Sequence, residues 1–127
     1  MILSPNDLKL FAGNGVATVT VLNISNAPGG GLNYLIPVFP PSEPQNSQAL
    51  GQTAITPDGK YLYVADFSVD QVSVISTSAN KSVQTVDMPG GSGPYNLTLA
   101  PYANYLYVSN FNGQTVAIVG VKEFVFP

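Results

Sequence analysis

Residues 56–67 read TPDGKYLYVADF and residues 100–111 read APYANYLYVSNF, so two similar copies of one segment occur 44 positions apart. The register continues without a gap, since VSVI at 72–75 falls on VAIV at 116–119. A weaker copy, SPNDLKLFAGN, stands at residues 4–14, at an offset of 52 from the middle copy. Repeats of roughly 40–45 residues built from short strands are typical of β-propeller blades. The pattern therefore predicts about three blades.

Each repeat has the pattern of short strands joined by tight turns. Leu62 and Val64 alternate with Tyr61 and Tyr63, as in a strand of a sheet. The turn residues Pro57-Asp58-Gly59 precede that strand and predict a hairpin connection. No segment has helical apolar spacing, and 12 Gly and 11 Pro interrupt the chain throughout. We expect an all-β fold of β-propeller-type repeats, with about three four-stranded antiparallel blades.

The repeats predict a single β-propeller-like domain over residues 1–127. We place its blades at about 1–48, 49–92 and 93–127, with a Pro- and Gly-rich insertion at 27–52 that falls mainly in the first blade. Propellers close with roughly four to eight blades. Three blades are too few to close a ring in a monomer. We therefore expect a second copy that completes a six-bladed ring, a polymer, or companion subunits that supply further blades.

Composition excludes several classes of function. The chain has no Arg, no His and no Cys, and its four Lys against seven acidic residues give a net charge of −3. Nucleic acid is not an expected partner, because basic patches and Arg carry that affinity. Disulfides, thiol chemistry and the usual zinc ligands are also excluded, and we expect no cofactor or metal. No apolar run is long enough to span a membrane, and the small polar residues favour an extracellular or cell-surface location.

One polar position recurs where the second strand of each repeat ends. It is occupied by Asn14, Asp66 and Asn110. A carboxylate there could bind a cation near a propeller axis. The alternative, a side chain that caps a turn by accepting from nearby backbone amides, explains all three copies at once. We expect structural turn caps.

Aromatic residues recur as well. They could stack on sugar rings or on a planar cofactor such as a quinone, but large flat side chains in a propeller more often fill the wedge between blades. We expect them to pack blade against blade. The residues are Tyr61, Tyr63, Phe67, Tyr105, Tyr107 and Phe111.

No pattern predicts catalytic residues in this chain. The carboxylates do not share a local spacing that would pair them for acid–base work or build a calcium loop. No Ser or Thr lies beside an activating base in any recognisable motif. Three acceptor sequons begin at Asn23, Asn80 and Asn96, and in a chain so rich in Asn, Ser and Thr they are weak evidence of glycosylation.

Four segments of the middle repeat resemble the YVTN family of β-propeller repeats. They are the turn Thr56–Gly59, the strand end Tyr63–Asp66, the strand Gln71–Ile75 and the outer strand Lys81–Val86. The resemblance implies a propeller fold and a surface or secreted setting. Related propellers include lactonase-like enzymes and quinoprotein dehydrogenase subunits. A repeat signature of this kind describes packing and turns rather than chemistry.

We therefore predict a non-catalytic structural or binding module at a cell surface or in a secreted assembly. It would act through self-association or companion subunits, with a glycan as a possible ligand, and would not be an enzyme. The alternative is a fragment or subunit of a propeller enzyme, lactonase-like or quinoprotein-dehydrogenase-like, whose catalytic residues lie outside this chain.

Overall fold

The computed structural model describes residues 2–3, 9–14, 18–23, 32–37, 50–79, 81–100 and 104–121. It places them in three antiparallel sheets. The first sheet has β1 (Ile2–Leu3), β2 (Lys9–Asn14), β3 (Thr18–Asn23) and β4 (Leu32–Pro37). The second has β5 (Thr53–Ile55), β6 (Tyr61–Asp66), β7 (Gln71–Ser76) and β8 (Lys81–Asp87). The third has β9 (Pro94–Leu99), β10 (Tyr105–Asn110) and β11 (Thr115–Gly120).

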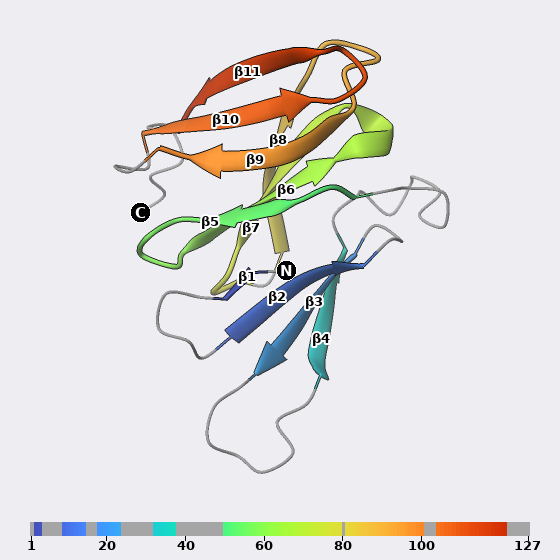
Figure 1. Ribbon diagram of the computed structural model, residues 1–127. Coiled ribbons are helices and arrows are strands. Elements are labelled where there is room, and N and C mark those ends of the chain that lie inside the picture. Colours follow the sequence, from blue (N-terminus) through green and yellow to red (C-terminus); the bar gives the residue numbers. More distant parts are fainter. Residues whose placement is uncertain are drawn as a thin grey trace.

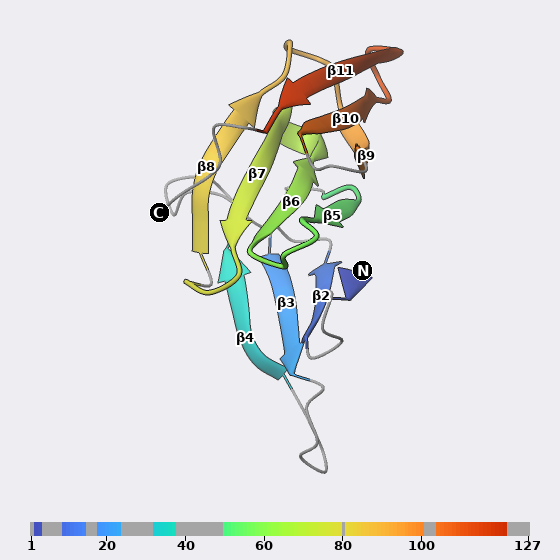
Figure 2. The same ribbon diagram turned by 90° about the vertical axis from the view of Figure 1, so that its left-hand side faces the viewer.

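Neighbouring strands in each sheet follow one another in the chain, as in propeller blades. Figure 1 shows the sheets one above another, with the green second sheet between the blue first sheet and the orange third. Figure 2 shows β4 and β8 on one side of the stack and β2 and β5 on the other. This arrangement confirms the predicted all-β propeller-type fold. Of the third predicted blade, residues 93–127, the structure describes 93–100 and 104–121.

The turn between β5 and β6 forms as its residues predict. Gly59 has a φ of +74°, which glycine adopts without steric cost. The Asp58 carboxylate accepts from the Thr56 hydroxyl at 2.6 Å and from the Lys60 amide at 3.0 Å. These bonds lower the pKa of Asp58, with the Thr56 bond the largest cause. The turn fixes the register in which Ile55 pairs with Leu62.

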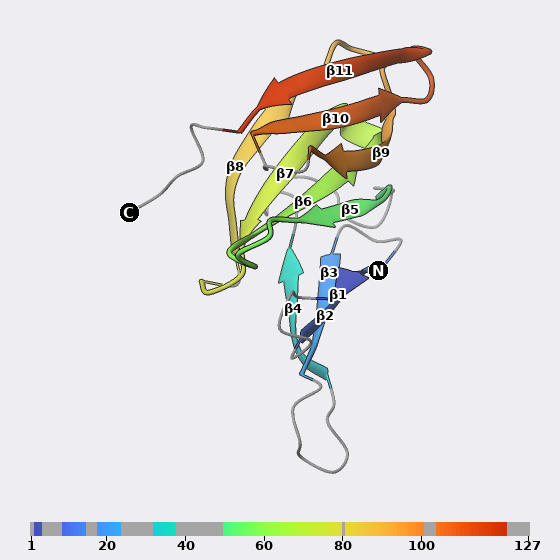
Figure 3. The same ribbon diagram turned by 60° about the vertical axis from the view of Figure 1, so that its left-hand side comes forward.

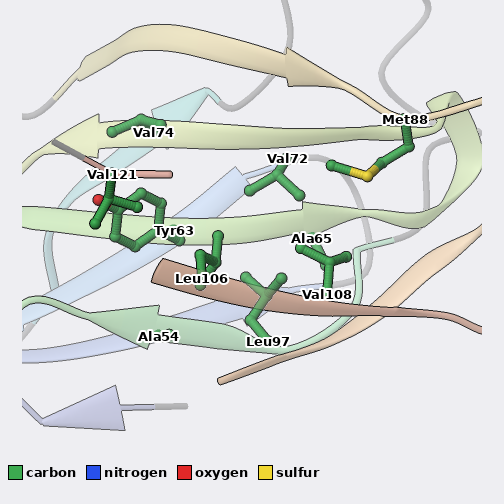
Figure 4. Close-up of a cluster of buried hydrophobic side chains, with 10 residues drawn as sticks. All are labelled: Ala54, Tyr63, Ala65, Val72, Val74, Met88, Leu97, Leu106, Val108 and Val121. Carbon is green, nitrogen blue, oxygen red and sulfur yellow. The ribbon is translucent and has the colours of Figure 1, made fainter. Parts of the chain in front are cut away.

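Strands β6 and β7 of the second sheet are buried on both faces because their residues alternate between two cores, whereas β8 is largely exposed. Leu62 and Val64 of β6 pack with Phe11 of the first sheet. Tyr63 and Ala65 point the other way, into a cluster shared with the third sheet. Figure 4 shows this second cluster, in which Leu97, Leu106 and Val108 meet Tyr63, Ala65, Val72 and Val74.

The inner strands of the second and third blades touch at Gly51. The Gln52 amide donates to the Tyr95 carbonyl at 2.7 Å, and a Cβ on Gly51 would lie 2.5 Å from that carbonyl oxygen. Only glycine permits so close an approach. The sheets are therefore joined by a backbone hydrogen bond as well as by their apolar core.

One short helical turn departs from the expectation of strands and loops alone. Phe67–Val69 forms a 3₁₀ turn between β6 and β7, and the described residues contain no α-helix. Three residues are too few to produce a periodic apolar pattern. Of the predicted insertion at 27–52, residues 32–37 form β4 and residues 50–52 lead into β5, while the others lie outside the described residues.

Candidate functional site

Three loops meet at one end of the second and third sheets. They are residues 67–70 between β6 and β7, residues 88–93 between β8 and β9, and residues 111–114 between β10 and β11. Backbone bonds join them: the Phe111 amide donates to the Gly93 carbonyl at 2.8 Å, and the Met88 amide donates to the Asp70 carbonyl at 2.8 Å. We call residues 67–70, 88–93 and 111–114 the loop end.

Asp70 is the polar centre of the loop end. Its carboxylate accepts from the amides of Gly93 and Gly91, each at 2.8 Å, and these bonds hold its pKa below the usual range. Asp70 has left-handed backbone angles of φ 56° and ψ 46°, and Gln114, 44 residues later, has φ 53°. No sequence pattern distinguishes Asp70 from the other carboxylates. The one feature that could have indicated its role is an Asp placed just before a strand, since Asp adopts left-handed backbone angles more readily than most residues.

An aromatic cluster lies at the loop end. Phe67 contacts Tyr95 edge-on, with ring centroids 6.2 Å apart and an interplanar angle of 88°. Phe111 completes the cluster at 6.5 Å from Phe67 and 6.3 Å from Tyr95. Phe111 is 71% exposed and Tyr95 is 44% exposed. Phe67 and Phe111 were predicted to fill the wedge between blades, but together with Tyr95 they form a partly exposed surface.

Asp66, at the end of β6, is fully buried. The Ser73 hydroxyl donates to Oδ2, and Oδ1 has no hydrogen-bond partner among the described residues. Burial raises the pKa of Asp66 to about 8, with the Ser73 bond opposing that shift. A pKa of about 8 favours the protonated form of Asp66 at neutral pH. It makes no capping bond to the 3₁₀ turn that follows it, which differs from the predicted backbone cap.

The equivalent position in the third sheet holds an amide. Asn110 is 2% exposed, and its Nδ2 donates to the Thr115 hydroxyl at 3.3 Å. It too bonds a side chain across the hairpin, whereas the prediction was a bond to backbone amides. The side chain of Asn14 lies outside the described residues.

The four tyrosines that were predicted to pack blade against blade lie in two different environments. Tyr63 is 1% exposed in the core between the second and third sheets, and Tyr61 packs against that core. Tyr105 and Tyr107 are 43% and 39% exposed on the outer face of the third sheet. Figure 3 shows this sheet at the end of the stack, and no described element covers its outer face.

The described residues do not assemble a metal site or an acid–base pair. No three of His, Cys, Asp and Glu gather closely enough in the described ranges to hold a metal ion. Each described carboxylate has its own partner: Asp58 in its turn, Asp66 on Ser73, Asp70 at the loop end, and Asp87 on the Gln71 side chain at 3.0 Å.

The sequons fall in different settings. Asn96 is exposed on β9, Asn23 ends β3, and Asn80 lies outside the described residues. In the part of the chain that the structure describes, no helix has the length and hydropathy to cross a membrane.

Comparison with known proteins gives one family match. The family model described as a lactonase, seven-bladed β-propeller matches residues 7–124. A 6-phosphogluconolactonase of Formosa agariphila is 29% identical over 94 residues, which are 70% of this chain and 27% of that protein. These matches confirm the predicted β-propeller family. They also show that the prediction of a non-catalytic module, not an enzyme, is wrong, because the family is one of lactonases.

Solved structures share the fold. A periplasmic gluconolactonase of Pseudomonas aeruginosa superposes with a TM-score of 0.71 and 23% identity, over 94% of this chain and 37% of that one. Hydrazine synthase of Kuenenia stuttgartiensis superposes with a TM-score of 0.78 and 20% identity, over 95% of this chain and 32% of that one. At these identities the likeness shows the fold alone. The chain spans between about a quarter and two-fifths of the length of these three relatives.

Proposed function

This chain belongs to the lactonase family of seven-bladed β-propellers, and from that premise we propose that it forms part of an enzyme that hydrolyses sugar lactones. The family match over residues 7–124 is the observation that carries the proposal. In the reaction, water adds to the lactone carbonyl carbon and the ring C–O bond breaks. The products are a carboxylic acid and a free hydroxyl on the same chain of carbons.

Within such an enzyme, this segment supplies scaffold and binding surface. General base catalysis requires a titratable group within hydrogen-bond reach of the attacking water. The described carboxylates are buried or already engaged in hydrogen bonds, as at Asp66 and Asp70. We place the catalytic groups in residues outside the described part of the chain.

The outer face of the third sheet is the place where the propeller continues. It exposes Tyr105, Tyr107, Val116 and Ile118. The same four positions in the second sheet, Tyr61, Tyr63, Val72 and Val74, pack against the third sheet. We propose that a further blade of the same repeat type covers this face, because the buried interface between the second and third sheets has the same composition. We also propose that the repeats are of the YVTN type and that a second copy or a companion subunit supplies the further blade. The proposed location is extracytoplasmic.

The test is hydrolysis of D-glucono-1,5-lactone and its 6-phosphate by the assembled propeller, in which this chain is joined by the blades that complete it, followed as acid release against the spontaneous rate. The proposal predicts acceleration that is proportional to protein concentration and is lost on heat denaturation. Rates equal to the spontaneous rate with both lactones would contradict it. The 6-phosphate is included because the matched Formosa agariphila protein carries that substrate in its name.

A further inference from the structure

We propose that Phe67 and Phe111 of the loop end, together with Tyr95 of β9, form a stacking subsite for the ring of a neutral sugar. The identification of that sugar with the substrate lactone rests on the proposed function. The three rings contact one another pairwise, with centroid separations of 6.2, 6.3 and 6.5 Å. They make a continuous aromatic surface contributed by two blades.

The surface is held rigid from beneath. The Asp70 carboxylate ties the loop before β7 to the amides of Gly91 and Gly93, and the Gly93 carbonyl accepts from Phe111. A Cβ on Gly93 would lie 2.6 Å from Nδ2 of Asn112 and 3.0 Å from Cε2 of Phe67, so both side chains pack directly on that backbone. A preorganised surface loses little conformational entropy when a ligand binds.

Exposed aromatic surface of this kind suits a sugar ring. The faces of Phe and Tyr rings carry negative electrostatic potential and attract the weakly positive C–H groups on a sugar face. Contiguous exposed apolar groups on a soluble protein commonly mark a binding site. Tyr95 adds a hydroxyl, and Asn112 beside Phe67 adds an amide, as hydrogen-bonding groups for a polyol.

The charge around the subsite favours a neutral ligand. The loop end, residues 67–70, 88–93 and 111–114, contains no Lys, and the chain contains no Arg. Its one charged group is Asp70, which is already bonded to two amides. Recognition of a phosphate uses Arg, Lys or free backbone amides. This surface therefore contributes stacking to a sugar ring and no attraction to a phosphate on it.

The subsite survives the docking of another blade. Phe67 belongs to the second blade, which the third blade already covers, and it is still partly exposed. Phe111 stands 44 residues later at the same position of the repeat. A further blade therefore reduces the exposure of Phe111 toward that of Phe67 without burying it.

The experiment measures saturation transfer by NMR from the purified protein to 1,5-anhydro-D-glucitol, a pyranose without a lactone to hydrolyse. We expect transfer to the ring C–H protons, a rise in Kd of about ten-fold in Tyr95→Ala and Phe111→Ala, and a smaller rise in Tyr95→Phe, which keeps the stacking ring and loses only the hydroxyl. Tyr105→Ala is the matched control, since Tyr105 is 43% exposed and Tyr95 is 44% exposed. Glucose 6-phosphate should bind no more tightly than the neutral sugar.

Failure of this inference is separable from failure of the proposed function. Absence of transfer to the sugar, or equal transfer in Tyr95→Ala, Phe111→Ala and the unchanged protein, overturns the subsite even if lactones are hydrolysed. Tighter binding of the phosphate also overturns the neutral assignment. Transfer that depends on Tyr95 and Phe111 in a protein without lactonase activity supports the subsite and removes only the link to the lactone.

Discussion

The second and third blades carry nearly the same strand sequence in opposite surroundings. Tyr63 is 1% exposed and Tyr107, 44 residues later, is 39% exposed. Val72 is fully buried, whereas Val116 at the same repeat position is 65% exposed. The repeated residues therefore specify a surface made for packing. Whether that surface is buried depends on the presence of the next blade.

The largest expected effect is at Tyr63. Tyr63→Ala removes a large buried side chain and leaves a void between the second and third sheets, at a cost of about 3–5 kcal/mol. Tyr107→Ala costs under about 1 kcal/mol where its face is open. Urea denaturation of the two variants of the monomeric 127-residue chain measures the difference, and equal losses would show that repeat position and not burial sets the energy.

The next effect is the pH dependence from Asp66. Burial raises its pKa in the folded protein from 3.8 to about 8, so its contribution to stability is full below about pH 4 and is lost as pH rises toward 8. The slope is at most about 1.4 kcal/mol per pH unit. Asp66→Asn, the amide already present at Asn110, should remove this dependence in denaturation midpoints taken from pH 5 to 9.

Asp87→Asn is the control for that series, because Asp87 is exposed on β8. It should leave the slope of the unchanged protein in place. A slope that persists in Asp66→Asn would mean that another group titrates, and it would remove Asp66 as the cause.

A smaller effect is expected at the contact between inner strands. Gly51 and Tyr95 occupy the same repeat position. Gly51→Ala would bring a Cβ within 2.5 Å of the Tyr95 carbonyl, whereas a Cβ on Gly120 meets nothing within 4 Å. We expect a loss of about 1–3 kcal/mol for the first change and within about 0.5 kcal/mol for Gly120→Ala. Thermal melts compare the pair, and identical melting temperatures would argue against the close approach.

The smallest effect concerns the loop end. Asp70 has a lowered folded pKa, so its stabilisation is present at neutral pH and is lost as pH falls through that pKa, below about 4. Asp70→Asn should cost less than about 1 kcal/mol, because the site is exposed. Amide exchange measured by NMR should be faster at Gly91 and Gly93 in this variant. Unchanged exchange at both glycines would show that the carboxylate does not order the loop.

The fold could be predicted well from the sequence because each blade is specified by patterns of residues that are close together in the chain. Alternating apolar residues and the turn at 56–59 fix strands without reference to distant contacts. The aromatic surface could not be predicted, because Phe67 of the second blade meets Tyr95 and Phe111 of the third blade only after the two blades pack. Asp70 was missed for the same reason: its partners Gly91 and Gly93 lie more than twenty residues away. The lactonase relationship was named only as an alternative, since repeat signatures report packing.

The direct test of the account is the solvent exposure of Tyr107 in the assembled protein in solution, compared with Tyr63. Hydroxyl-radical footprinting read by mass spectrometry gives both rates in one sample, normalised to the denatured chain. The account predicts that a further blade covers the outer face of the third sheet, so that Tyr107 is protected nearly as well as Tyr63. Modification of Tyr107 at close to the denatured rate, with Tyr63 still protected, would contradict it.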